Sequence, residues 1–294
     1  MKLKRNIIFS LFLIFGQFRL FAEINNVSHG WGLFSRVSDS RVAALSFSTI
    51  AYPIKSSGIS LVNPALSIMY NEKIGLTHQS KFEGMVNSEF VGFNKKISDS
   101  SWVNIALLYE GIGSIPDTRN ALLDWGSDGV FGTFDQGENN GILDEGERID
   151  ANKVSYFNQN QFGVYGAISK PYRGWSIGVG MKLLFHTFDD NYALGTGINL
   201  GALRSFENGT SIGVVLYDAP TSGVLWNNGD VELTPSSFSV GIHHLFLYEK
   251  YQIAINPVCR LDILMKEQTI DSRILLNSIP FEVSGGIETI YKRK

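Results

Sequence analysis

The feature that most constrains the fold is a repeated alternation of bulky apolar residues with small or polar ones. It is clearest in residues 174–187. The apolar members share one parity: Trp175, Ile177, Val179, Met181, Leu183 and Phe185. The lean members share the other: Ser176, Gly178, Gly180, Lys182 and His186. Because successive strand side chains point to opposite faces, the pattern predicts β-strands with one apolar face and one semi-polar face.

This alternation predicts ten strands along the chain, with turn residues between them that favour a meander of antiparallel neighbours. The predicted ranges are 73–80, 85–95, 101–111, 159–170, 174–188, 191–205, 210–217, 236–248, 251–263 and 280–292. A soluble β-sandwich or lipocalin-like barrel also alternates, but its outward face should carry many charges. Charges are sparse here, and aromatic residues gather near strand ends. We therefore predict an all-β protein, a transmembrane antiparallel β-barrel in contact with outer-membrane lipid.

The first 22 residues have the character of a secretory signal peptide. Lys2, Lys4 and Arg5 form a basic head, an apolar run follows over 7–15, and Ala22 offers a small residue for cleavage. The run is shorter than the ~20 residues that a spanning helix needs. We expect cleavage after export, and a location in the outer membrane of a Gram-negative-type cell. With a single Cys, the chain cannot form an intramolecular disulfide.

Several functional classes find no support in the sequence. The net charge is only −3, and the basic residues Lys292–Lys294 are a short terminal tail, so nucleic acid is not an expected partner. The His residues lack HExxH spacing and no Gly-x-Ser-x-Gly element is present, so we expect neither an enzyme nor an organic cofactor. His186 or His243 could meet a Ser across strands, but a polar histidine in a barrel lumen is the favoured interpretation.

Residues 41–67 differ from the strands, because small and apolar residues lead there through a polar turn to Asn63-Pro64-Ala65. Together with the signal and the glycine-rich strands, this element resembles the N-terminal region of the PorV/PorQ-type outer-membrane proteins, relatives of the FadL long-chain fatty-acid transporters. The resemblance implies that residues 23–70 form a hatch, with Asn63, Pro64 and Ala65 as its motif, inside a barrel formed by residues 71–294. Pro64, with its fixed φ, could begin a helix.

The family resemblance implies a fourteen-strand barrel, whereas about ten strands are visible in the sequence. The chain ends at Tyr291-Lys292-Arg293-Lys294 without the aromatic terminal residue that is common in such proteins. Two alternatives follow: the chain is a truncated copy, or the barrel closes with fewer strands.

An acidic, glycine-rich insertion over 111–158 contains two consecutive twelve-residue units, 124–135 and 136–147. Each has Gly at its sixth position and a carboxylate at its twelfth, as EF-hand loops have. The candidate Ca²⁺ ligands are Asp124, Asp128, Asp135, Glu138, Asn140, Asp144 and Glu147. Gly126 and Gln136 depart from that pattern. The alternative is a solvated acidic loop that holds no ion.

Three functions remain open from the sequence. The PorV/PorQ resemblance implies a non-enzymatic component associated with type IX secretion, which docks secreted cargo or secretion-system proteins at the cell surface. The FadL resemblance implies transport of a hydrophobic small molecule past the hatch. A secreted calcium-dependent adhesin is the third, and it requires that the barrel prediction be wrong.

Overall fold

The structure is a computed structural model that describes residues 24–25, 31–36, 40–69, 73–264, 274–276 and 279–291. The predicted signal peptide lies outside these residues. The strands are β1 (Ile24–Asn25), β2 (Lys73–Lys81), β3 (Val86–Ser98), β4 (Ser101–Asp117), β5 (Leu122–Leu123), β6 (Arg148–Ile149), β7 (Ser155–Tyr172), β8 (Trp175–Phe188), β9 (Asn191–Ser205), β10 (Thr210–Trp226), β11 (Val231–His244), β12 (Phe246–Tyr248), β13 (Ile253–Leu264), β14 (Ile274–Leu276) and β15 (Ile279–Tyr291). The helices are α2 (Gly32–Arg36), α3 (Ser40–Ala44), α4 (Ile59–Val62) and the 3₁₀ turns η2 (Thr49–Ala51), η3 (Pro64–Met69), η4 (Phe82–Gly84), η5 (Ala151–Lys153) and η6 (Glu249–Tyr251).

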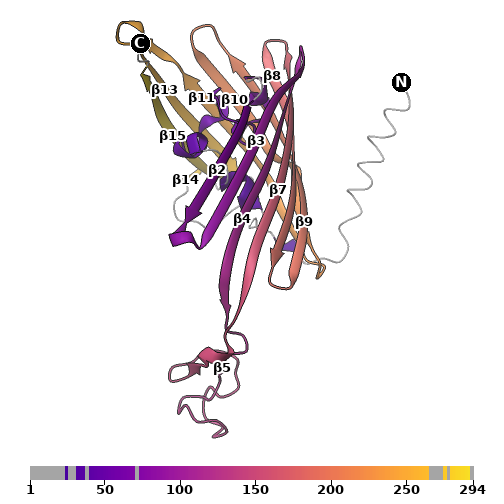
Figure 1. Ribbon diagram of the computed structural model, residues 1–294, viewed down its shortest axis with the longest axis vertical. Coiled ribbons are helices and arrows are strands. Elements are labelled where there is room, and N and C mark those ends of the chain that lie inside the picture. The colour runs from indigo at the N-terminus through magenta and orange to yellow at the C-terminus, as the bar shows by residue number, and fades with distance from the viewer. Residues whose placement is uncertain are drawn as a thin grey trace, which may run out of the picture.

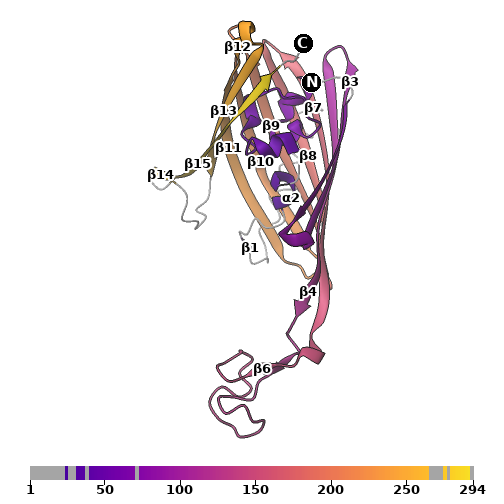
Figure 2. The ribbon, with the colours of Figure 1, turned by 60° about the vertical axis from the view of Figure 1, so that its left-hand side comes forward.

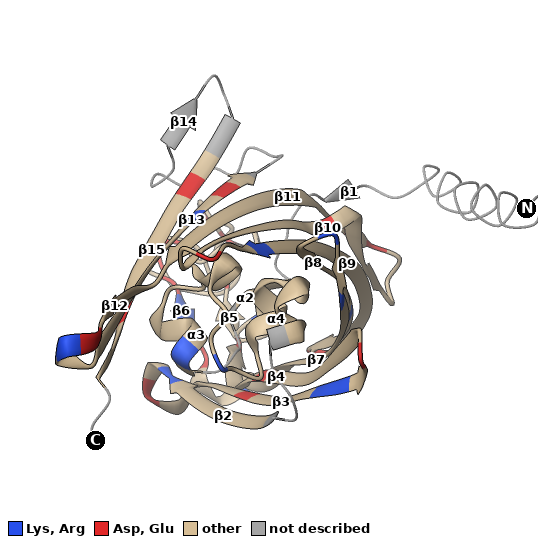
Figure 3. Ribbon diagram, turned by 90° about the horizontal axis from the view of Figure 1, so that it is seen from above, with Lys and Arg blue, Asp and Glu red and all other residues tan. Residues whose placement is uncertain are grey.

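The long strands form one continuous antiparallel sheet, which confirms the predicted all-β meander. Its order is β14-β15-β13-β11-β10-β9-β8-β7-β4-β3-β2, with β12 paired to β13 and β1 parallel to β11. Seen from above, the sheet curls around the short helices (Figure 3). Among the described strands, β2 and β14 each have one neighbour, so the curved sheet, which we call the wall, is open between these two edges.

Each predicted strand is present, but the region around β10 and β11 was predicted too short. The prediction ended at Tyr217, whereas β10 continues to Trp226 and turns through residues 227–230 into β11. Residues 218–220 form a bulge opposite the single residue Ser236 of β11. Pro220 has no N–H to donate to a neighbouring strand, so its presence indicated the end of a strand. The strand nevertheless resumes beyond the bulge. Likewise β4 and β7 pair as far as Asp117 and Ser155, which leaves residues 118–154 outside the wall (Figure 1).

Burial along the wall is the inverse of that in a soluble protein. The apolar parity of β8 points outward, with Ile177 44% and Met181 49% exposed, whereas inward-facing Lys182 is 4% exposed. The same arrangement holds on β9, where Leu200 is exposed and Asn199 is buried. The alternation in the sequence therefore gives the sheet an apolar outer surface and an inner surface of small and polar residues.

The space inside the wall is filled by residues 31–36 and 40–69, which we call the inner segment (Figure 2). Two apolar clusters join it to the wall. One centres on Trp31, Leu33 and Phe34, packed against Phe90 and Tyr165 of β3 and β7. The other surrounds Ile50, Ile59 and Leu66, packed against Leu203, Val215 and Val258 of β9, β10 and β13. The core of the protein thus lies between the inner segment and the inward face of the sheet.

Glycines on that inward face let the inner segment approach the wall closely. Gly178 and Gly201 are directly paired across β8 and β9. A Cβ on Gly178 would lie within 3.0 Å of Ala65 N, and one on Gly201 within 3.0 Å of Asn63 Oδ1. Any side chain here would therefore push against the backbone that carries Asn63, Pro64 and Ala65.

We predict that Gly178→Ala lowers the free energy of unfolding by about 1–3 kcal/mol, the usual cost of overpacking a filled core. Gly166→Ala is the matched control, because a Cβ on that strand glycine meets nothing within 4 Å. Denaturant unfolding of both variants in detergent micelles measures the difference. Equal stabilities would contradict the close packing of the inner segment against β8.

Candidate functional site

The side chain of Asn63 forms hydrogen bonds both within the inner segment and to the wall. It is fully buried and follows α4, with extended backbone angles. Its Nδ2 donates to Ile50 O at 2.8 Å and to Ala202 O of β9 at 3.3 Å, while its Oδ1 accepts from Ala65 N at 2.9 Å. The turn η3 begins at Pro64, whose fixed φ suits a helix start. The Asn-Pro-Ala element therefore forms a turn that contacts the wall.

Polar side chains of the wall satisfy backbone carbonyls of the inner segment at several further points. Asn104 Nδ2 donates to Ser57 O at 2.9 Å, Tyr165 OH to Ser60 O at 2.7 Å, and Ser176 Oγ to Ala65 O at 2.6 Å. At the other edge, Arg41 forms an ion pair with Glu288 of β15 at 2.5 Å. Short helices leave many carbonyls without an internal partner, so the wall supplies the donors that water would otherwise provide.

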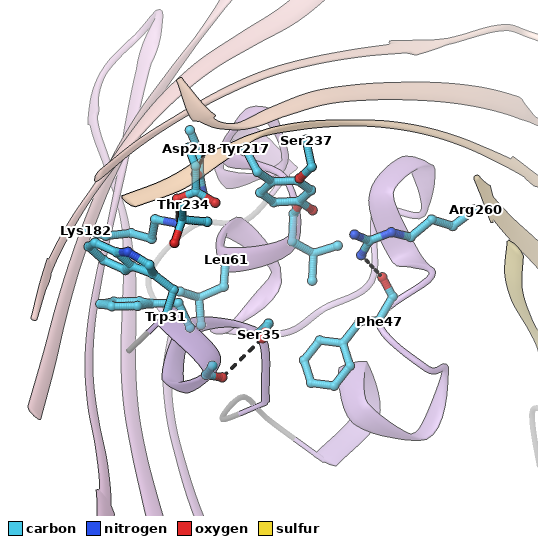
Figure 4. A pocket seen from close by; sticks show the side chains of 14 residues that line it. Trp31, Ser35, Phe47, Leu61, Lys182, Tyr217, Asp218, Thr234, Ser237 and Arg260 are labelled. Carbon is cyan, nitrogen blue, oxygen red and sulfur yellow. Dashed lines mark hydrogen bonds and ion pairs between the residues drawn. The ribbon is translucent and has the colours of Figure 1, made fainter. Parts of the chain in front are cut away.

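A cavity of about 350 Å³ lies between the inner segment and the wall (Figure 4). Trp31, Phe34 and Phe47 of the inner segment line one side. Lys182, Asn199, Tyr217, Asp218, Thr234 and Arg260 line the other, from β8, β9, β10, β11 and β13. Ser35, which is exposed, lies at its edge. The cavity thus combines aromatic faces with hydrogen-bonding and charged groups.

Lys182 and Asp218 form a buried ion pair at this cavity. The bulge of β10 places Asp218 there, with φ of 56°, and Ser236 Oγ fixes the bulge by donating to Asp218 O at 3.0 Å. Ser222 Oγ donates to the Asp218 carboxylate at 2.5 Å. The ammonium of Lys182 also lies 4.8 Å from the centre of the Trp31 ring, a cation–π distance.

Arg260 forms a second charge pair at the far side of the cavity. Its guanidinium contacts Asp262 at 2.7 Å and donates from Nη1 to Phe47 O at 3.0 Å. Both basic groups that line the cavity are therefore matched by a carboxylate. The inward parity of Lys182 was visible in the sequence, but its partner was not, because Asp218 reaches the lumen only through the bulge.

Both histidines considered for catalysis face the lumen and are buried. His186 Nε2 lies 3.1 Å from Gln159 Nε2, and the ring lies 5.0 Å from that of Trp226. His243 Nε2 lies 3.1 Å from Asn256 Oδ1, and its ring stacks on Tyr52 at 4.3 Å. His186 thus contacts residues of the wall, whereas His243 contacts both the wall and the inner segment.

The acidic excursion, residues 118–154, extends away from the wall (Figure 1). Arg119 anchors its base by contacting Asp117 at 2.7 Å and Asp189, of the β8–β9 turn, at 2.5 Å. The hydrogen bonds from Arg119 hold the pKa of Asp117 down to about 2, so this carboxylate is ionised at neutral pH. The contact therefore ties the excursion to the neighbouring hairpin.

Within the excursion the two acidic units interlock. Asp124 Oδ2 accepts from Gly141 N at 2.7 Å, and Glu147 Oε1 accepts from Gly126 N at 2.8 Å, so each unit holds the other. Glu138 also bonds to the other unit, because its carboxylate accepts from Gly132 N. The remaining predicted calcium ligands bond within their own unit: Asp128 accepts from Val130 N, Asp135 from Asp128 N, Asn140 from Ile142 N, and Asp144 from Asn140 Nδ2. Among the described residues, no three His, Cys, Asp or Glu side chains gather as a metal site.

Taken together, the fold and this lumen define a curved antiparallel sheet around an inner segment, with a polar and aromatic cavity between them. No helix in the described part of the chain is long and apolar enough to cross a membrane. No family model matches the sequence, and no curated protein matches it. Among solved structures, the chain is similar to OmpT (in-vitro folded), an outer membrane protein of Vibrio cholerae, at 11% identity and a TM-score of 0.36. The match covers 69% of this chain and 64% of that one.

We predict that Lys182→Met and Asp218→Asn each destabilise the protein by about 3–5 kcal/mol, since either leaves a buried charge without its partner. The double variant should cost less than the sum of the two single variants. Lys170→Met, at an exposed position of β7, is the control. Denaturant unfolding in micelles measures all four. If each single variant loses less than about 1 kcal/mol of stability and the two losses add, the pair behaves as a solvent-exposed salt bridge.

The calcium prediction concerns the excursion and is tested by its protease sensitivity. We expect millimolar Ca²⁺ to slow cleavage within residues 114–152, because an ion would replace repulsion among carboxylates by shared coordination. Asp124→Asn with Glu147→Gln should remove this protection, whereas Asp230→Asn, in a different turn, should not. If Ca²⁺ does not change the rate of cleavage, the prediction is wrong.

Proposed function

We propose that the chain is an outer-membrane protein whose wall sits in lipid. The observation that carries this proposal is the inverted burial: large apolar side chains face outward on strand after strand while charged and amide groups face the lumen. Contiguous apolar surface of this extent is costly in water and favourable in the hydrocarbon core of a bilayer. Between the edge strands β2 and β14, each strand would satisfy its backbone hydrogen bonds with its neighbours, as lipid requires.

Within that class, we propose a non-enzymatic docking role resembling that of the PorV/PorQ-type components associated with type IX secretion. The filled lumen supports docking over passage, because the inner segment contacts the wall from β3 to β15. The excursion offers a docking surface, because it carries several exposed apolar side chains: Val130, Phe131, Phe134, Ile142 and Leu143. Long connections of outer-membrane barrels lie on the extracellular side, where secreted cargo would be met.

A second candidate is FadL-like transport of a hydrophobic molecule, and one observation favours it. An apolar groove of about 630 Å³ lies beside β10, lined by Phe185, Leu194, Val224 and Leu225 among others. It adjoins the stretch where β9 and β10 lose register between Leu216 and Gly223. A gap in strand pairing beside an apolar groove would suit a ligand that enters from lipid.

The membrane proposal predicts how the mature chain behaves after refolding. Residues 23–294 should show β-sheet circular dichroism in detergent micelles and compact gel migration that is lost on boiling. The outward apolar face is the physical reason, since it needs detergent or lipid to cover it. A monodisperse water-soluble β protein would overturn the proposal.

The docking proposal is tested by replacing residues 118–154 with Asn-Gly, because Asp117 and Ser155 are already paired across β4 and β7. The wall should still fold, cargo secretion by a type IX host should fall, and uptake of a hydrophobic probe should stay intact. Phe131→Ser with Phe134→Ser is the milder variant, which removes only exposed apolar groups. Normal cargo secretion with lost uptake would favour the transport candidate instead.

A further inference from the structure

We infer that the cavity beside Lys182 and Asp218 is a binding site for one neutral, hydroxyl-rich molecule of the size of a simple sugar. This inference goes beyond the docking role, because it concerns the lumen and not the excursion. It depends on three properties of the cavity, which are its balanced charge, its unpartnered polar atoms and its aromatic faces.

The charges that line the cavity are matched within the protein. Lys182 is paired with Asp218, and Arg260 with Asp262. An anion would have to displace a carboxylate from its cation, and a cation would have to displace Lys182 or Arg260, so either ligand would break a buried pair. A neutral ligand leaves both pairs in place and can still hydrogen-bond to them.

Two buried polar atoms of the lining have no hydrogen-bond partner among the described residues. They are Trp31 Nε1, a donor, and Thr234 Oγ1, which can donate and accept. Trp31 is only 6% exposed, and Figure 4 shows it beside Lys182 at the cavity. Buried polar atoms are almost always satisfied, so these atoms call for a ligand with both donors and acceptors. An acyl chain would leave them unpaired at about 1–3 kcal/mol for each group.

The aromatic residues complete the match to a sugar. Trp31 and Phe34 present ring faces on the same side as the Lys182 ammonium, which lies 4.8 Å and 5.8 Å from their ring centres. A sugar ring has apolar C–H faces, which pack on aromatic rings, and a rim of hydroxyls, which bond to charged and hydroxyl side chains. The volume of about 350 Å³ is at the lower end of small-molecule sites, which begin near 300 Å³. Exposed Ser35 at the edge gives the cavity a side that meets solvent.

The test is a binding titration of the mature chain refolded in an amine-oxide detergent, because a sugar-headed detergent would compete. Glucose, galactose and maltose are the neutral probes; glutamate is the anionic probe and oleate is the acyl-chain probe. We expect a saturable calorimetric signal with at least one saccharide and none with glutamate or oleate at this site. Trp31→Phe keeps the ring but loses the N–H, and Thr234→Val keeps the shape but loses the hydroxyl. Each should weaken saccharide binding roughly three- to tenfold, the worth of one hydrogen bond.

Trp102→Phe, on β4 and outside the cavity lining, is the matched control and should bind as the wild type does. Each protein is first shown to be folded by heat-modifiable migration, so loss of folding is separated from loss of binding. Three results would overturn the inference: no saccharide bound by the folded chain, affinity unchanged in both cavity variants, or glutamate or oleate bound in place of the saccharides. None of these results depends on cargo secretion, so the docking proposal stands or falls separately.

Discussion

The whole arrangement depends on direct contact between the backbone of the inner segment and the inward face of the sheet. The inner segment has only short helices, so its carbonyls need partners from outside, and burial excludes water from that role. The wall meets this need in two ways: Asn104, Tyr165 and Ser176 donate hydrogen bonds, and glycines such as Gly178 and Gly201 remove the side chains that would hold the two backbones apart. The small and polar residues on the inward face of the strands therefore make direct contact with the inner segment.

The same contacts join parts of the sheet that are far apart. Ser57 accepts from Asn104 of β4, while Arg41 pairs with Glu288 of β15, so the inner segment is bonded near both ends of the described sheet. A curved wall whose edge strands lack mutual pairing would otherwise be free to flatten, because an open sheet has no fixed curvature of its own. Filling the lumen thus fixes the curvature, and the curvature in turn presents the apolar parity of every strand outward. The inverted burial is a consequence of this packing as much as of the strand pattern.

How much the sequence could predict depended on how local each feature is. Strand alternation is local, so the positions of the strands and the inward direction of Lys182 and His186 followed from it. The Asn63-Pro64-Ala65 turn also carried a local signal in its proline. The contact of that turn with Gly178 and Gly201 is not local, and it follows only when β8 and β9 pair in the observed register. The hydrogen bonds of Asp124 and Glu147 between the two units show the same limit. A repeat in the sequence does not reveal which carboxylate oxygens will accept from backbone N–H groups of the other unit.

The bulge in β10 shows how one irregularity can both hide a strand and create a site. Pro220 cannot donate to the ladder, and three residues of β10 stand opposite Ser236 alone, which interrupts the alternation that strand prediction relies on. In a regular strand, the residue after inward-facing Tyr217 would point outward. The bulge instead turns Asp218 inward to Lys182, and Thr234 lines the same cavity. A buried carboxylate is tolerated there because the Lys182 ammonium and the Ser222 hydroxyl both donate to it. The cavity therefore lies beside the irregular part of the sheet, and the residues that stabilise the bulge also supply the polar groups of the cavity.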